Sequence, residues 1–135
     1  MNTIVRSKRI LESLKAYHPV HDGMMPKFLR DSDFKDDLVI GVYENVVDSI
    51  DHCVVITEEG MHIEKQGKWI EIRFVEIENV YSPSSKETEK KDAEVNMVLE
   101  NGKNVTVPVW GGTGRFLDVF EFSRFLARVV EDFAA

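Results

Sequence analysis

The sequence predicts a mainly β domain: about seven antiparallel strands forming a sandwich or partly open barrel, preceded by one helix and capped by another. Between residues 38 and 110, apolar side chains recur at two-residue spacing, as they do along half-buried strands. Short turn sequences such as Asn101-Gly102 separate these runs, and short connections join antiparallel neighbours. The chain has 135 residues, of which 43% are hydrophobic and 30% charged, which is enough for one domain with its own core.

The N-terminal residues 3–17 have helical apolar spacing, and Pro19 disfavours continuation of a helix beyond them. The apolar side chains of this amphipathic helix form a candidate assembly surface, which comprises Ile4, Leu11, Leu14 and Tyr17. Residues 18–37 contain prolines, a glycine and polar runs, as a connector does. We therefore divide the chain into an N-terminal helix and connector (residues 1–37) and a β domain (residues 38–135).

Seven strands are expected in the β domain, at residues 38–43, 53–57, 61–65, 69–74, 77–81, 93–100 and 103–110. Gly41 inside the first strand indicates a bulge or a close backbone approach. Pro108 cannot donate a ladder hydrogen bond, so its strand should end at a sheet edge or a bulge. Residues 82–92 are polar and rich in Lys and Glu, which favours a solvated hairpin loop and leaves a binding role for this loop open.

The C-terminal helix is expected from Phe116 to Phe133, where apolar residues recur at helical spacing over more than one face. Such a helix should fill the open end of the barrel. A glycine-rich segment precedes it, and helix N-termini expose free amide groups to anions. The candidate anion contact comprises Gly112, Thr113, Gly114 and Arg115. The segment lacks the Lys-Ser/Thr ending of a phosphate-binding loop, so a sharp strand-to-helix corner is the favoured interpretation.

The charge of the chain is −7, with +4 on residues 1–30 and −11 on residues 31–135. An acidic body excludes nucleic acid as an expected partner. The basic N-terminal arm could dock on its own acidic body, on a second copy or on an anionic surface. Residues 1–17 contain no apolar run of signal-peptide length, so a cytoplasmic location is expected.

Few residues carry recognisable chemistry. Cys53 is the single cysteine, and we expect a buried structural thiol and no disulfide framework. His18, His21 and Asp22 fall short of the usual ligand set for zinc, so no metal site is expected. No nucleophile motif is present, so neither an enzyme nor a cofactor is expected. A ligand-binding barrel would draw its polar contacts from inward strand positions, for which the candidates are Tyr43, His62, Trp69 and Arg73.

Two segments resemble the bacterial pleckstrin-homology-like (PH-like) domains. Residues 53–62, CVVITEEGMH, are similar to the pattern of apolar strand, Thr, turn, Gly and apolar residue in that family. Residues 69–80, WIEIRFVEIENV, resemble the strand that follows and its I-x-x-V corner. The resemblance spans residues 38–133. It implies a seven-stranded PH-like barrel with a C-terminal helix, and a noncatalytic binding or scaffolding function.

Some PH-like relatives bind phosphoinositides through basic residues in the loop between the first two strands. Here that loop is residues 46–52, which contain two aspartates and neither Lys nor Arg, so we do not expect a phosphoinositide site. The favoured function is protein–protein interaction or self-assembly into a homo-oligomer. The alternatives are weak peripheral membrane attachment through residues 1–17 and a small-ligand-binding barrel. The sequence leaves open whether the N-terminal helix packs on its own chain, on another copy or on lipid.

Overall fold

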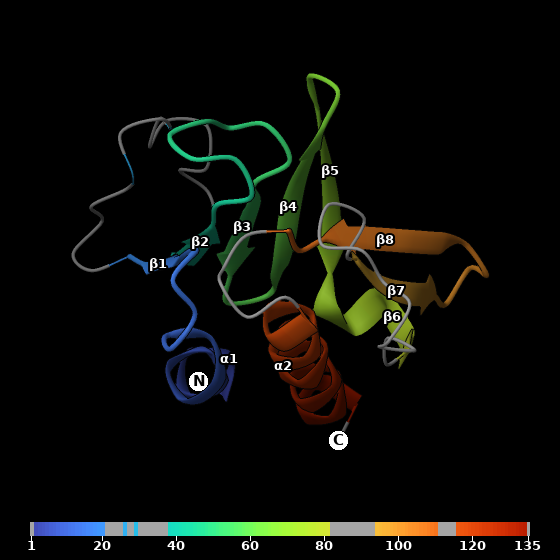
Figure 1. Ribbon diagram of the computed structural model, residues 1–135. Helices are drawn as coiled ribbons and strands as arrows, with labels where there is room; N and C mark the ends of the chain where they lie inside the picture. The colour runs from blue at the N-terminus through green and yellow to red at the C-terminus, as the bar shows by residue number, and fades with distance from the viewer. Residues whose placement is uncertain are drawn as a thin grey trace.

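The computed structural model describes residues 2–20, 26, 29, 38–81, 94–110 and 116–134. It contains two antiparallel sheets, with the C-terminal helix α2 (Phe116–Ala134) and the N-terminal helical arm (residues 2–14) packed beside each other at one end (Figure 1). The first sheet has five strands in the order β1 (Tyr17–Pro19), β2 (Val39–Tyr43), β3 (Val54–Thr57), β4 (Gly60–Lys65) and β5 (Lys68–Arg73). The second has three, in the order β6 (Ile77–Tyr81), β7 (Glu94–Leu99) and β8 (Asn104–Pro108). The helices are α1 (Asn2–Arg6), the π-helix η1 (Ser7–Leu11), the 3-10 turn η3 (Phe74–Glu76) and α2 (Phe116–Ala134).

The predicted mainly β class and the C-terminal helix are confirmed, but the predicted N-terminal helix is too long. Helical backbone ends at Leu11, and Tyr17–Pro19 is a short strand that pairs with β2, with Tyr17 opposite Tyr43. The described ranges therefore hold eight strands, where the sequence predicted seven. Strand pairing with β2 is favoured over a longer helix because it buries the Tyr17 ring. The Tyr17 hydroxyl also donates to the Ile40 carbonyl over 3.4 Å.

The core lies between the sheets and α2, whose inward face is fully buried. Phe122 packs edge-on against the Tyr43 ring of the five-stranded sheet, with ring centres 5.5 Å apart. Phe125 makes a similar contact with Phe74, at 6.3 Å. Each such aromatic pair contributes about 0.5–1.5 kcal/mol beyond the burial of its area. The expectation of a C-terminal helix packed in the core is confirmed, whereas its place at the open end of a barrel stays a prediction.

The N-terminal arm packs on its own chain. Leu11 and Leu14 are buried in the same core as α2. Arg6 donates two hydrogen bonds to the carboxylate of Asp132 near the end of α2, from Nε at 3.1 Å and from Nη2 at 3.2 Å. A basic residue of the arm thus pairs with the acidic body. The division of the chain at residue 37 stays a prediction.

Two predictions about single residues of the sheets are confirmed. The register between β2 and β3 shifts between Val39 and Gly41, which is the irregularity that a strand glycine predicts. Gly41 is also a close-approach site, because a β-carbon there would overlap the Tyr17 ring. Pro108 is the last residue of β8, the edge strand of the three-stranded sheet.

Asp118, in the first turn of α2, is an acidic group inside the core. It is 2% exposed, and its carboxylate accepts a hydrogen bond from the Tyr43 hydroxyl over 2.6 Å. Burial raises the pKa of Asp118 above its ordinary value, and the Tyr43 hydrogen bond partly opposes this rise. This bond ties the start of α2 to the end of β2.

Replacing Gly41 with Ala tests the close approach between β2 and Tyr17. We expect Gly41→Ala to lower the free energy of unfolding by about 1–3 kcal/mol, because the buried ring must move. Urea unfolding measures the change. Unchanged stability in Gly41→Ala would contradict the packing of Tyr17 on this glycine.

The buried carboxyl of Asp118 predicts a specific pH dependence. A raised native pKa means that the folded chain binds this proton before the unfolded chain does as the pH falls. The wild type should therefore gain stability relative to Asp118→Asn as the pH falls through the raised pKa, and the difference should level off below about pH 4. Asn retains an oxygen that can accept from Tyr43. Urea unfolding of both proteins between neutral and acid pH gives the difference; a pH-independent difference would refute the raised pKa.

Candidate functional site

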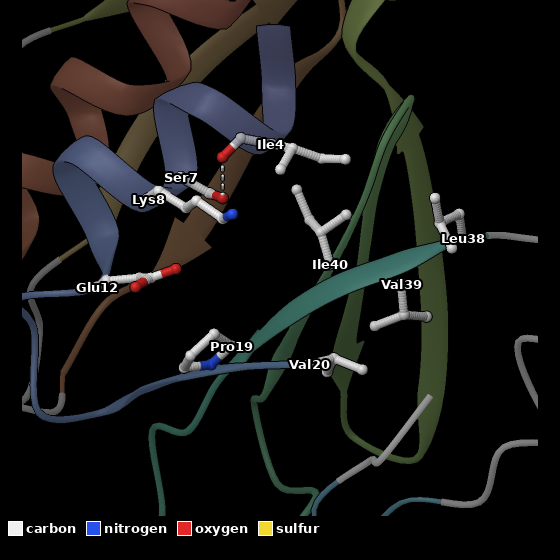
Figure 2. A pocket seen from close by; sticks show the side chains of 9 residues that line it. All are labelled: Ile4, Ser7, Lys8, Glu12, Pro19, Val20, Leu38, Val39 and Ile40. Atoms are coloured by element: carbon white, nitrogen blue, oxygen red, sulfur yellow. Dashed lines mark hydrogen bonds between the residues drawn. The ribbon is translucent and has the colours of Figure 1, made fainter. Parts of the chain in front are cut away.

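An open groove lies between the N-terminal arm and the start of β2. Its volume is about 310 Å³, at the lower end of the range for ligand sites. The helical wall comes from α1, η1 and the turn after them, and the sheet wall comes from β1 and β2 (Figure 2). The lining residues are Ile4, Ser7, Lys8, Glu12, Pro19, Val20, Leu38, Val39 and Ile40. Residues 38–40 of the sheet wall are more than twenty residues from the helical wall in the sequence.

The helical wall contains a π turn, a rare element that is frequent at functional sites. The backbone N–H of Glu12 donates to the Ser7 carbonyl over 3.2 Å, which spans five residues. The Ser7 hydroxyl donates to the Ile4 carbonyl over 2.8 Å and is therefore occupied. Figure 2 shows the Lys8 ammonium and the Glu12 carboxylate reaching into the groove from this wall. The groove thus offers two opposite charges on its helical side.

The sheet wall is apolar, and the backbone carbonyl of Ile40 is already hydrogen-bonded. It accepts from the Val20 N–H over 3.0 Å and from the Tyr17 hydroxyl. Leu38 is 58% exposed although it is a large aliphatic residue. In Figure 2 the side chains of Ile4 and Ile40 point toward one another across the groove. An apolar side chain placed here would contact both walls.

A second unusual surface is the loop between β2 and β3, residues 44–53, which we call the 44–53 loop. It lies at the end of the five-stranded sheet away from the helices (Figure 1). Three aliphatic side chains in this loop are exposed: Val46 at 37%, Val47 at 78% and Ile50 at 39%. Exposed aliphatic groups gathered on one loop are typical of interaction surfaces.

The 44–53 loop is held in one conformation by side chains at its base. The Asn45 amide donates to the His52 carbonyl over 2.6 Å, and the Asp48 N–H donates to the Glu44 carboxylate over 2.7 Å. Asp48 and His52 have φ values of 56° and 57°, in the left-handed region that Asp and His adopt more readily than most other residues besides glycine. Together with the two hydrogen bonds, these turns hold the loop in one backbone shape.

The buried carboxylate of Glu64 joins the 44–53 loop to the neighbouring hairpin. Glu64 is 4% exposed and accepts from the His52 N–H at 2.8 Å and from the Gly67 N–H at 2.7 Å. The His52 ring also lies on the Trp110 ring, with centres 4.4 Å apart. Sequence reasoning missed Glu64, because a Glu in an alternating strand is normally a solvated residue.

The predicted assembly residues are placed within a single chain. Leu11, Leu14 and Tyr17 are buried in its core, whereas Ile4 is half-buried and lines the groove. Their role as an assembly surface stays a prediction. The candidate anion contact at residues 112–115 lies outside the described residues, as does the loop at 82–92.

The weaker candidates do not form a common site. His18 bonds to the Glu44 carboxylate at 3.0 Å, while His21 and Asp22 lie outside the described residues. No cluster of three metal-ligating side chains occurs in the described part of the chain. Of the barrel-ligand candidates, Tyr43 is buried against Phe122, whereas Arg73 is exposed and pairs with Glu59. His62 is half-buried and Trp69 is 37% exposed, and neither lines the groove.

Cys53 is fully buried, as predicted. Burial raises the pKa of its thiol to about 12, and the negative charges of Glu64, Asp51 and Glu44 add to the rise. At neutral pH the side chain is therefore a protonated thiol, which lacks the reactivity of a thiolate.

Comparisons with protein-family models, with curated proteins and with solved structures find no match to this chain. Within the described residues, no helix combines the length and the apolar character needed to cross a membrane.

The buried thiol predicts the reactivity of Cys53. In the native protein at pH 8, Cys53 should react with the thiol reagent DTNB only as fast as the chain opens, because its pKa is about 12 and its sulfur is covered. In guanidinium chloride the same thiol should react as a free cysteine does. Absorbance of the released thiol measures both rates, and rapid reaction of the native protein would contradict this environment.

Proposed function

We propose that this chain is a noncatalytic binding module that holds an apolar segment of a protein in the groove between η1 and β2. The observation that carries the proposal is the groove itself, about 310 Å³ in volume and apolar at most of its lining positions. The apolar lining residues are Ile4, Pro19, Val20, Leu38, Val39 and Ile40. The charges of Lys8 and Glu12 at its helical wall can orient a segment that carries polar groups beside its apolar side chains.

The open shape favours a protein segment over an enclosed small molecule. Leu38 is more than half exposed at the rim, so a bound partner must itself supply the cover that excludes water. Burying each aliphatic side chain contributes about 1.5–3 kcal/mol, before the costs of association are subtracted. Two or three such side chains support a weak, reversible contact.

We further propose that the domain is a variant of the PH-like fold. The antiparallel sheets, the C-terminal helix packed on both and the resemblance of residues 53–62 and 69–80 support this assignment. The 44–53 loop would then be the loop that carries basic residues in phosphoinositide-binding relatives. Here its exposed charged residues are Asp48 and Asp51, so a phosphoinositide is not the proposed ligand. Membrane attachment by the arm is less favoured, because the arm buries Leu11 and Leu14 within the chain.

A peptide titration tests the groove. The probe is a capped pentapeptide, acetyl-Ser-Val-Ala-Ile-Ser-amide, with acetyl-Ser-Ser-Ala-Ser-Ser-amide as the polar control. We expect the apolar peptide to shift the amide resonances of Leu38, Val39 and Ile40 in a saturable manner, with a Kd on the order of 1 mM. The polar peptide should not, because it has no aliphatic group to bury.

Leu38→Asp, at an exposed position of the groove, should abolish these shifts without loss of stability. Val75→Asp is the matched control, since Val75 is 54% exposed and lies outside the groove. Shifts that are absent, spread over the whole protein or unaffected by Leu38→Asp would overturn the proposed function.

A further inference from the structure

We propose that the occupant of the groove is the 44–53 loop of a second copy of this chain, a proposal that rests on the proposed function. Val47 of one copy enters the groove of the next, and Ile50 covers the rim at Leu38. Val47 is 78% exposed, more than any other large hydrophobic side chain in the described residues. The protein thus carries both a groove with an apolar sheet wall and an apolar projection that is open to solvent.

The charges around the two surfaces favour this pairing. Asp48 and Asp51 are exposed beside the aliphatic side chains of the loop. Lys8 reaches into the groove, so Asp48 of the incoming loop can lie against it. The same aspartates oppose contact with an anionic lipid surface, which favours a protein partner.

The loop is suited to docking because its shape exists before binding. The bonds from Asn45 and Glu64 to His52 close the loop at its base and anchor it to the sheet. A preformed loop loses little conformational freedom on binding, which leaves more of the burial energy for affinity. A mobile loop would lose more conformational freedom on binding, and less of the burial energy would remain for affinity.

The positions of the two surfaces make the contact head-to-tail. The groove is lined by the start of β2 and the loop follows its end, and an extended strand of five residues spans about 15 Å. A loop therefore cannot fold back into the groove of its own chain. Each copy offers one projection and one groove, so copies can join in an open row or a closed ring.

A complementation experiment tests the pairing. Val47→Asp damages only the projection and Leu38→Asp damages only the groove, both at exposed positions. We expect each variant alone to be monomeric in sedimentation equilibrium at concentrations where the wild type associates. An equimolar mixture should form 1:1 heterodimers and nothing larger, since it holds one intact projection and one intact groove per pair.

Two further variants sharpen the test. Val75→Asp, the matched control, should associate as the wild type does. Lys8→Glu should weaken the association constant about five-fold, the size expected of an exposed ion pair. A wild type that stays monomeric, a Val47→Asp variant that still associates, or a mixture that stays monomeric would overturn the proposal. Flotation of the wild type, but not of Val47→Asp, with phosphatidylserine vesicles would assign the loop to a membrane and also overturn it.

The peptide titration separates the two proposals. If the apolar peptide binds the groove but the mixture stays monomeric, the groove takes another protein and only the self-pairing fails. If the apolar peptide causes no saturable shifts at residues 38–40, the proposed function fails as well.

Discussion

The packing of α2 against both sheets is the constraint on which the rest of this structure depends. Phe122 contacts the five-stranded sheet, whereas Phe125 packs on Phe74 in the η3 turn between the sheets. Removing either ring would leave a cavity and cost about 3–5 kcal/mol. The N-terminal arm rests on the same helix, with Arg6 against Asp132. α2 therefore holds the helical wall of the groove at its distance from β2. The width of the groove thus depends on α2, although no described residue of α2 lines the groove.

The elements that could be predicted from the sequence are those specified by residues close together in the chain. The hairpin from Gly60 to Arg73 was predicted closely because alternation and a short turn suffice to specify it. The strand at Tyr17 was missed because it exists only through pairing with β2, a partner more than twenty residues away. Local helical spacing continued through Tyr17, and tertiary pairing overrode it.

The candidate site was less predictable than the fold. Buried Glu64 and Asp118 have no local signature, since each occupies a position where a solvated acid is common. The groove joins residues 4–12 to residues 38–40, and no periodicity relates such segments. The apolar residues of the 44–53 loop were visible in the sequence, but their exposure was not. That exposure depends on the hydrogen bonds of Asn45 and Glu64 to His52. These bonds hold the loop backbone in a conformation that directs the aliphatic side chains away from the core.

The π turn of η1 lets two contacts of the N-terminal arm coexist. It accommodates one residue more than an α-helical turn between Arg6, which is paired with Asp132, and Leu11, which is buried in the core. Because the extra residue is absorbed as a bulge, the segments on either side keep their faces. A further residue inserted into continuous helix would instead turn the preceding segment by about 100° around its axis. Arg6 would then leave Asp132, or Leu11 would leave the core, so the arm has already used the one insertion that its winding can absorb.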